Sequence, residues 1–555
     1  MVLPASSALR TLAHIPQNIV ALVLDMTVSR FLLAFLAAVL VGGCASLPPG
    51  SDFPKTVSSA LAQPEETRLG RQFADAGRQH GGNSAFRMLA VGVDGFLARV
   101  QMVNAAERTL DLQYFIFRAD ETGKLLTNAV LQAADRGVRV RVLIDDGETI
   151  AGDDQLVALD AHPQVEVRIF NPFIYRGHFM FMRALEFTFS IARLDYRMHN
   201  KMMVVDNSIA LIGGRNVGDE YFQIDPKTQF ADDDVFAAGP LVKELSATFD
   251  EFWKSDMAIP VRALAEATAS DVALAAYRKV LADHHAEKKA DGTDYASRVA
   301  TGEPLAAMLS GKLPLVWAQA QLIYDSPNKK EVGKEGMVGR LMHRPVAAAV
   351  AAVQTELLMT TPYLIPGDEG MALFGDLRKR NVRVRILTNS LESSNVLAAH
   401  SGYIRYRPLL LVGGSEVHEV RSLLGNARGS GQTASISRFG NYSLHAKLFV
   451  FDRKRLFVGS MNFDQRSMHL NTEIGLIIDS PELAQQAATR FEAMVSPPNS
   501  YEVVLRAGDG IGSPQLGWRT EEGGKIVEYD TEPARSNGQR FGLKLLSLLP
   551  LDDEL

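Results

Sequence analysis

Two segments of the sequence repeat the same set of chemically capable side chains. Residues 198–216 and residues 444–462 align without a gap at an offset of 246 positions. The aligned positions are His199, Lys201, Asp206, Gly213, Gly214 and Asn216 in the first segment, and His445, Lys447, Asp452, Gly459, Ser460 and Asn462 in the second. One His-x-Lys arises often by chance, but its duplication with the same partners is a specific signal.

These residue types suit reaction at a phosphodiester. A neutral imidazole can attack phosphorus while a protonated imidazole gives its proton to the departing alkoxide, and the near-neutral pKa of histidine allows both states. Lysine and asparagine can hold the nonbridging oxygens, each donor contributing about 2 to 4 kcal/mol in the transition state. The expected catalytic residues are His199, Lys201, His445 and Lys447, and the expected phosphate-binding residues are Asn216, Asn462 and Ser460. This chemistry requires no metal ion or other cofactor.

Each segment is predicted to place its motif on a strand. Apolar residues alternate around the motif, and residues two apart on a strand face the same way, so histidine and lysine project together. The polar steps that begin at Asp206 and Asp452 predict turns, after which a second strand returns the asparagine to the histidine. We expect these two aspartates to end a strand and bond backbone rather than to act in catalysis. Because Gly214 stands where the second copy has Ser460, a hydroxyl can reach the phosphate from one half only.

The duplication extends through most of the chain. Residues 138–143 (VRVRVL) match residues 382–387 (VRVRIL), and each half reads as strand, helix, strand. This order predicts βαβ units, and hence two α/β sandwiches whose sheets are parallel or mixed. The expected domains are residues 65–240 and 311–497, with a helical linker at 241–310 and a C-terminal extension at 498–555.

The N-terminus is typical of a bacterial lipoprotein signal. An apolar run at residues 31–41 follows Arg30 and precedes Gly-Gly-Cys, so Cys44 would be lipidated within a signal peptide at 1–44, followed by a tether at 45–64. Met26 gives a more compact signal than Met1 and is the expected start. Ala45 is not aspartate, which by resemblance to bacterial sorting signals suggests a periplasm-facing protein of the outer membrane. The alternative is a plain anchor with a chance cysteine.

Composition limits the partners. A hydrophobic fraction of 46% in 555 residues is typical of a globular protein, and a net charge of −6 gives no overall attraction to nucleic acid. No basic cluster interleaved with stacking aromatic residues stands out either, so no nucleic-acid partner is expected. The N-terminal signal makes the bacterial membrane an expected partner, and phospholipid partners are implied by the family resemblance given next.

The paired His-x-Lys-x(4)-Asp motifs resemble those of the phospholipase D superfamily. The resemblance implies two α/β/α sandwich domains related by a pseudo-twofold axis and sharing one active site, with His199 as the nucleophile and His445 as the acid. It also implies an acidic residue downstream of each motif that orients the motif's histidine. Glu473 fits this role in the second half, and Asp234 fits it in the first, with Asp232 as a competing assignment.

A wider resemblance narrows the group. Segments such as 197–201 (RMHNK) and 213–222 (GGRNVGDEYF) are similar to the cardiolipin synthase C type, from about residue 65 onward. This similarity implies transfer of a phosphatidyl unit to the alcohol of phosphatidylglycerol. The aromatic residues 173–189 could line an acyl-chain site or pack in the core. A phospholipase D hydrolase, a periplasmic metal-independent nuclease and a noncatalytic lipid-binding lipoprotein remain alternatives.

Overall fold

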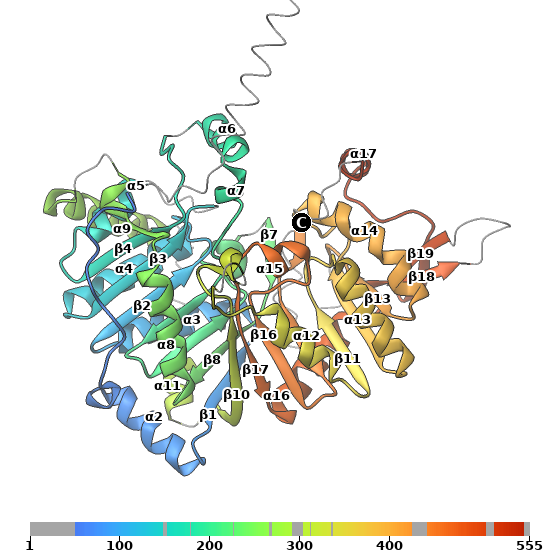
Figure 1. The fold of residues 1–555 in the computed structure, drawn as a ribbon, viewed down its shortest axis with the longest axis horizontal. Helices are drawn as coiled ribbons and strands as arrows, with labels where there is room; N and C mark the ends of the chain where they lie inside the picture. Colours follow the sequence, from blue (N-terminus) through green and yellow to red (C-terminus); the bar gives the residue numbers. More distant parts are fainter. Residues whose placement is uncertain are drawn as a thin grey trace, which may run out of the picture.

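The protein consists of two α/β halves that lie side by side, the first coloured blue to green and the second yellow to red (Figure 1). The computed structural model describes residues 50–147, 153–177, 179–225, 227–265, 269–290, 304–310, 312–332, 334, 337–423, 441–506 and 515–548. The expected signal peptide, with Met26 and Cys44, lies outside the described residues.

Eighteen of the twenty described strands form one continuous sheet. In spatial order, the first half contributes β9 (Ala258–Pro260), β4 (Val165–Phe170), β3 (Arg139–Asp145), β2 (Thr109–Tyr114), β5 (Met202–Val205), β6 (Ile209–Gly213), β8 (Asp234–Ala238) and β1 (Ser84–Leu89). The second half continues with β10 (Val316–Tyr324), β17 (Ile474–Asp479), β16 (Arg455–Gly459), β15 (Leu448–Phe451), β11 (Glu356–Thr360), β12 (Arg383–Asn389), β13 (Glu416–Val420), β18 (Ser500–Arg506), β19 (Gln515–Glu522) and β20 (Lys525–Tyr529). The halves join where β1 pairs antiparallel with β10.

The two halves have the same strand order when each is counted outward from the β1–β10 junction. The strands β8, β6, β5, β2, β3 and β4 correspond to β17, β16, β15, β11, β12 and β13. In each set of six, the last three strands are parallel to one another, and the remaining strands pair antiparallel. This order confirms the α/β class and the pseudo-twofold relation of two homologous units.

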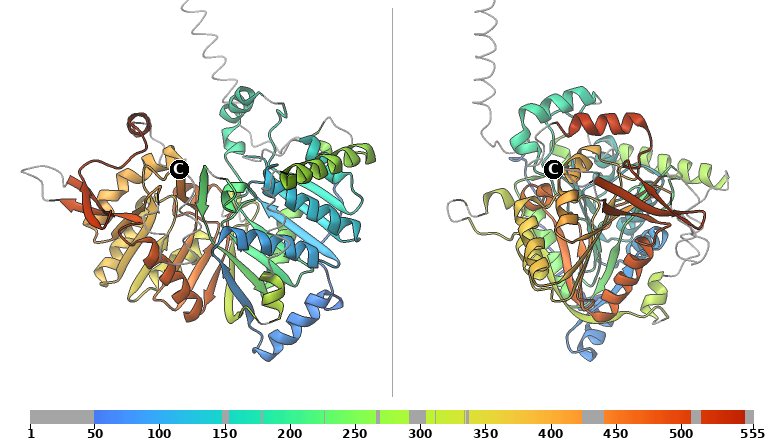
Figure 2. Two further views of the ribbon diagram at one scale, coloured as in Figure 1. Left: turned by 180° about the vertical axis from the view of Figure 1, so that it is seen from behind. Right: turned by 90° about the vertical axis from the view of Figure 1, so that its right-hand side faces the viewer.

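Helices cover both faces of the sheet, which gives three layers in each half (Figures 1 and 2). The helices of the first half are α2 (Arg68–Gln79), α3 (Gly92–Ala105), α4 (Glu121–Asp135), α5 (Asp153–Asp160), α6 (Met180–Phe189), α7 (Ile191–Leu194), α8 (Leu241–Lys254), α9 (Asp271–Ala290) and α11 (Pro304–Leu309). Those of the second half are α12 (His343–Ala351), α13 (Gly367–Lys379), α14 (Leu397–Val412), α15 (Gln465–His469), α16 (Pro481–Met494) and α17 (Asn537–Leu546). One apolar core spans both halves and includes Trp253 of α8 and Phe491 of α16.

The boundaries of the halves differ from those expected from the sequence. Helix α8 buries Phe249 and Trp253 completely, and β9 pairs with β4, so the first half continues past residue 240 into the expected linker. Strand β18 pairs with β13 and is followed by the β19–β20 hairpin, so the expected C-terminal extension completes the edge of the second half. These segments lack the duplicated motifs, and only their packing assigns them to a half.

Part of the expected tether also packs on the first half. Arg168 donates a hydrogen bond to the carbonyl of Thr56 at 2.8 Å, and the Ala60 N–H donates to Asp250 at 2.9 Å. Residues 56–60 are therefore held against the protein by specific contacts rather than hanging free.

Candidate active site

Each histidine motif is held by a backbone hydrogen bond from the opposite half. The His199 N–H donates to the Thr472 carbonyl at 2.9 Å, and the His445 N–H donates to the Ala231 carbonyl at 2.7 Å. Beside the second contact, β7 (Thr228–Ala231) pairs in parallel with β14 (Asn441–Leu444) in a two-stranded sheet that crosses between the halves. The duplicated motifs thus lie at the interface of the halves, where one site can use both.

The motifs begin just before the strands rather than on them. Strands β5 and β15 start at Met202 and Leu448, immediately after the lysines, so the expectation that the whole motif lies on a strand is wrong at its start. The turns follow as expected. Asp206 and Asp452 both have positive φ, 51° and 53°, at the hairpin that returns the chain along the next strand.

The two motif aspartates bond backbone, as the sequence predicted. The carboxylate of Asp206 accepts hydrogen bonds from the N–H groups of Glu107, Arg108 and Thr109 at 2.8 to 2.9 Å. Asp452 accepts from the N–H groups of residues 354–356 in the same way. Each aspartate therefore fastens its hairpin to the start of the neighbouring strand, β2 or β11.

His199 is oriented by a carboxylate of the second half. Its Nδ1 lies 2.9 and 3.0 Å from the two carboxylate oxygens of Glu473. A carboxylate can only accept a hydrogen bond, so Nδ1 carries the proton and Nε2 of the neutral ring keeps its lone pair. The hydroxyls of Ser460 and Ser467 donate to Glu473 at 2.5 and 2.8 Å, which fixes that carboxylate in turn.

His445 is oriented by Asp232, not by Asp234. The Nδ1 of His445 lies 2.5 Å from Asp232 Oδ2, whereas Asp234 accepts hydrogen bonds from the guanidinium groups of Arg99 at 2.8 Å and Arg215 at 3.2 Å. The preferred assignment of Asp234 is therefore wrong, and the competing assignment of Asp232 gives the contact. Asp234 is fully buried in a structural ion-pair cluster.

Strand register explains which aspartate takes this place. Gly213 pairs with Asp234 in β6–β8, as Gly459 pairs with Gly475 in β16–β17. Asp234 and Gly475 are therefore equivalent positions in the two halves. Two residues before each of them lie Asp232 and Glu473, which are equivalent in turn. The expectation that each acidic residue orients the histidine of its own motif is also wrong, because Glu473 holds His199 and Asp232 holds His445.

The lysines lie deep in the site with their ammonium groups against the histidine backbone. Both are 1% exposed; Lys201 Nζ donates to the His199 carbonyl at 2.6 Å, and Lys447 Nζ donates to the His445 carbonyl. The charge of Lys447 acts on His199 and that of Lys201 acts on His445. The four predicted catalytic side chains are thus brought together in one site.

The three predicted phosphate-binding residues differ in whether their side chains already have hydrogen-bond partners. The Asn216 amide is engaged, because its Oδ1 accepts from the Ile116 N–H at 3.1 Å and its Nδ2 donates to the Tyr221 hydroxyl at 2.8 Å. The Asn462 oxygen is buried without a hydrogen-bond partner among the described residues. Ser460 donates to Glu473 and accepts from the Ile474 N–H, so its hydroxyl supports Glu473 rather than standing open to a ligand.

Burial and charge set the protonation of the site. Burial, with the nearby ammonium groups of Lys201 and Lys447, lowers the pKa of His199 well below its usual value. Burial raises the pKa of Glu473 to about 7 and lowers the pKa of Lys201 to about 7 and that of Lys447 to about 8. Burial would also raise the pKa of Asp232, but the neighbouring His445 and Lys447 outweigh it and hold that pKa well below its usual range.

Aromatic rings wall the two histidines differently. Phe115 meets the His199 ring edge-on at 5.0 Å. His445 contacts two rings, Phe230 stacked at 5.4 Å and Tyr221 edge-on at 5.2 Å. The site is therefore asymmetric in its walls and in its carboxylates. The asymmetry expected at Gly214 and Ser460 was of another kind, a hydroxyl contact to phosphate, and the Ser460 hydroxyl bonds Glu473 instead.

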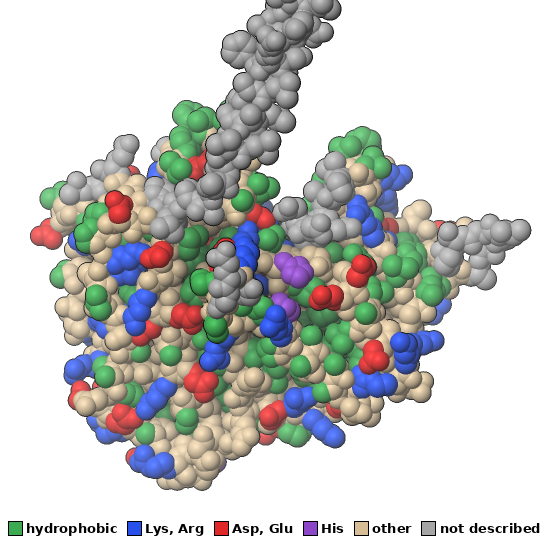
Figure 3. Space-filling view, in the orientation of Figure 1, with side chains coloured by type: hydrophobic (Ala, Val, Ile, Leu, Met, Phe, Trp, Pro, Cys, Tyr) green, Lys and Arg blue, Asp and Glu red, His purple; other side chains and the backbone are tan. Residues whose placement is uncertain are grey.

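The aromatic stretch at 173–189 does not pack in the core. Phe179 and Phe181 are 74% and 73% exposed, and hydrophobic side chains project from the surface around α6 (Figure 3). Phe173, at its start, is buried. The expectation of a core element is therefore wrong for the exposed residues of α6, and the expectation of an acyl-chain lining stays a prediction.

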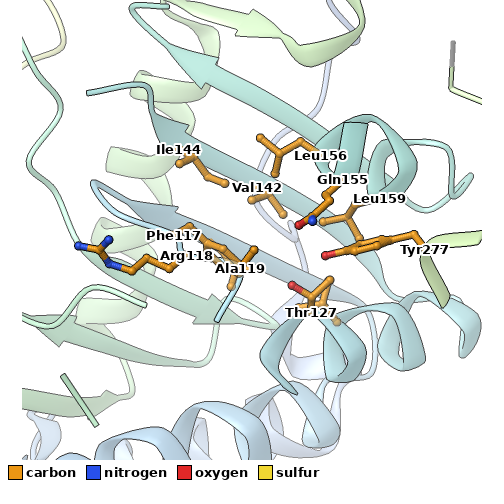
Figure 4. A pocket seen from close by; sticks show the side chains of 12 residues that line it. Phe117, Arg118, Ala119, Thr127, Val142, Ile144, Gln155, Leu156, Leu159 and Tyr277 are labelled. Carbon is orange, nitrogen blue, oxygen red and sulfur yellow. The ribbon is translucent and has the colours of Figure 1, made fainter. Parts of the chain in front are cut away.

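A separate cavity lies inside the first half. It encloses about 20 Å³ between β3, α5 and α9, with Val142 and Tyr277 among its lining residues (Figure 4). A space of that size holds little more than a water molecule, and none of the predicted site residues lines it. Within the described ranges, no cluster of three or more His, Cys, Asp or Glu is placed to bind a metal, and no helix is long and apolar enough to cross a membrane.

Comparison with known proteins identifies relatives across most of the chain. A family profile described as "Cardiolipin synthase, PLD-like domain" matches residues 100–253 and 347–495, one stretch in each half and together more than half of the chain. Cardiolipin synthase C of Escherichia coli (strain K12) is 35% identical over 484 residues, covering 85% of this chain and 97% of that protein. The major cardiolipin synthase of Bacillus subtilis (strain 168) is 25% identical, covering 75% of this chain and 70% of that protein.

Among solved structures, a phosphatidylserine synthase of Haemophilus influenzae Rd KW20 matches at a TM-score of 0.47 and 12% identity, covering 78% of this chain and 92% of that one. The family profile includes His199 in its first matched stretch and His445 in its second. The paired motifs, the profile match in both halves and the extent of the 35% identity agree. The chain belongs to the phospholipase D superfamily and is of the cardiolipin synthase type.

Proposed function

We propose that this protein is a phosphatidyltransferase that moves a phosphatidyl group between phospholipids through a phosphohistidine intermediate. The observation that carries the proposal is the pair of histidines, each with its Nδ1 against a carboxylate of the opposite half. This contact leaves each Nε2 available for chemistry, one as a nucleophile and the other as a proton carrier. The relatives named cardiolipin synthase support lipid rather than nucleic acid as the substrate.

In the first step, His199 Nε2 attacks the phosphorus of a phospholipid. A nitrogen–phosphorus bond forms, the bond from phosphorus to the headgroup oxygen breaks, and His445 donates its Nε2 proton to the departing alcohol. The low pKa of His199 keeps its lone pair free at neutral pH. Burial and the charge of Lys447 also lower the pKa of His445, to about 3, and the Asp232 carboxylate opposes this shift, so Asp232 favours the imidazolium form that the acid role requires. Lys201 and Lys447 hold the phosphoryl oxygens as negative charge builds on them.

In the second step, His445 accepts the proton of an incoming alcohol, whose oxygen attacks the phosphorus. The bond to His199 breaks and a new phosphodiester leaves the site. When the alcohol is the headgroup of phosphatidylglycerol, the product is cardiolipin. When water takes its place, the product is phosphatidic acid, so the acceptor separates a synthase from a phospholipase D.

Product analysis of the purified full-length chain tests this function. Vesicles of phosphatidylethanolamine and phosphatidylglycerol should yield cardiolipin, measured by lipid mass spectrometry, and His199→Asn and His445→Asn should reduce the yield to background. Phosphatidic acid alone would identify a hydrolase, and degradation of plasmid DNA without lipid turnover would identify a nuclease. Lipid turnover that survives both substitutions would contradict the phosphohistidine route. A cellular function that survives loss of both histidines would favour the noncatalytic lipid-binding lipoprotein.

We also propose that the protein is attached to the cell envelope by lipidation of Cys44 and faces the periplasm, in the outer membrane. The support is the sequence of residues 31–45 alone. Cys44→Ser should release the protein from the membrane fraction, and metabolic labelling with a clickable palmitate analogue should be lost with it. Labelling that persists in the variant would contradict lipidation at this cysteine.

A further inference from the structure

Helix α6 is turned with its apolar side outward. Phe181 is 73% exposed and Leu185 39% exposed, with Phe179 and Phe189 exposed beside them. Its ionisable residues face the protein instead, because Arg183 donates to the Asp146 carbonyl at 2.8 Å and Glu186 accepts from the Ile174 and Tyr175 N–H groups at 2.7 and 2.8 Å. A helix that turns its charges inward and its phenylalanines outward is suited to an apolar partner.

Helix α17 and the turn after it also expose apolar side chains, in the second half. Phe541 and Leu545 on the helix and Leu548 just beyond it are 71%, 59% and 79% exposed, while Leu543 packs inward. The exposed Lys544 lies on the same helix and adds positive charge beside the apolar residues. Figure 3 shows hydrophobic side chains gathered over α6 and again over α17.

Each helix is attached to the segment that holds one of the two histidines. Helix α7, which follows α6, ends at Leu194, five residues before His199. On the other side, Gln539 of α17 donates to the Leu391 carbonyl at 2.6 Å, in the loop that follows β12. Asn389, at the end of β12, accepts from the N–H of Leu444, which is the residue before His445.

The two helices also stand at the same edge of the molecule. They come from opposite halves, yet both lie at the top in Figure 1 and in both views of Figure 2. A flat surface can therefore touch both at once.

We propose that α6 and α17 form a two-part docking surface for the surface of a phospholipid bilayer, one part attached to each histidine motif. The inference rests on the proposed function for the lipid nature of the partner. Docking would bring a headgroup phosphate toward the shared site while the acyl chains stay in the membrane. A bilayer fits better than a second copy, because the outward face of α6 carries apolar residues and α17 adds the basic Lys544, the pairing that binds anionic membranes.

Activity on two physical forms of substrate tests the docking. In the full-length protein, Phe181→Ser with Leu185→Ser, and separately Phe541→Ser with Leu545→Ser, should lower turnover of phosphatidylglycerol vesicles by about tenfold or more. Turnover of dihexanoyl phosphatidylglycerol, dissolved as monomers, should stay within about twofold, because the site itself is untouched. The control is Ile526→Ser on β20, which is 61% exposed at the far edge of the sheet and should change neither rate.

Equal losses on both substrates, or no loss on vesicles, would overturn the docking surface. A wild-type protein that is inactive on both vesicles and dissolved monomers would refute the proposed function but not the docking. A second experiment therefore measures docking without any turnover. Phe181→Trp and Phe541→Trp should be quenched more by vesicles of brominated phosphatidylcholine than Ile526→Trp. Quenching equal to that of the Ile526→Trp control would overturn the proposal. Sedimentation showing that the serine substitutions convert a dimer into a monomer would also overturn it, because the surface would then bind a second copy of the chain.

Discussion

Asp232→Asn should abolish most of the turnover while leaving the fold intact. The substitution keeps the shape of the side chain but removes the negative charge that lies 2.5 Å from His445 Nδ1. His445 then loses the group that fixes its tautomer and stabilises its imidazolium form. A positioned acid–base group contributes about 10²- to 10⁴-fold, so we expect kcat to fall by that factor, equivalent to about 3 to 5 kcal/mol of transition-state stabilisation.

Asp234→Asn provides the matched comparison two residues away. Asp234 pairs with Arg99 and Arg215 in a cluster whose side chains are 1 to 2% exposed. Removing its charge leaves two buried guanidinium groups without their carboxylate, which costs about 3 to 5 kcal/mol. The expected result is a Tm lower by on the order of 10 °C with little change in kcat below the transition.

Two measurements distinguish the two variants. One is the initial rate of headgroup release from phospholipid vesicles, and the other is thermal unfolding followed by circular dichroism. Low rate with near-normal Tm is expected for Asp232→Asn, and the reverse for Asp234→Asn. If Asp234→Asn lost activity at an unchanged Tm while Asp232→Asn kept the wild-type rate, the assignment of Asp232 to His445 would be refuted.

Three further predictions follow from the same geometry. The pH profile of kcat/KM should be a narrow bell: it should rise as Glu473, with a pKa of about 7, loses its proton and can hold His199 Nδ1–H, and fall as Lys201 and Lys447, with pKa values of about 7 and about 8, lose the charges that bind phosphate. A flat profile from pH 6 to 9 would contradict these assignments. Gly214→Ala should lower kcat by about tenfold or more, because its Cβ would lie 2.1 Å from Asp232 Oδ1 and must displace that carboxylate; an unchanged steady-state rate would argue against it. Asp206→Ala should reduce the free energy of unfolding by about 3 kcal/mol, since three backbone N–H groups lose their acceptor, and urea denaturation at unchanged specific activity is the measurement.

The sequence was sufficient for the parts of the fold that repeat. The constant offset between the motifs predicted two α/β units, and the hairpin turns at Asp206 and Asp452 lie where the polar steps placed them. The roles of these two aspartates were also predictable, because a conformation with positive φ and a short carboxylate together favour bonding to nearby backbone. Local signals of this kind are read from a few neighbouring residues.

The exchange of carboxylates between the halves was not predictable in the same way. Nothing near Glu473 in the sequence indicates that it meets His199 rather than His445, because that choice depends on how the halves dock. The sequence alone does not show whether Asp232 or Asp234 orients His445, and only the register of β6 with β8 distinguishes them. The exposure of α6 was missed because an apolar run gives the same signal for a buried and for a membrane-facing helix.

Each half supplies the carboxylate that orients the histidine of the other half, so each half is needed for the activity of the other. Two separate polypeptides built this way would lose activity on dilution, since each would keep its histidine but not the carboxylate that orients it. Joining them in one chain turns their association into an intramolecular event, at an effective concentration on the order of millimolar for a short flexible connection. The specific activity of this enzyme should therefore be independent of its own concentration.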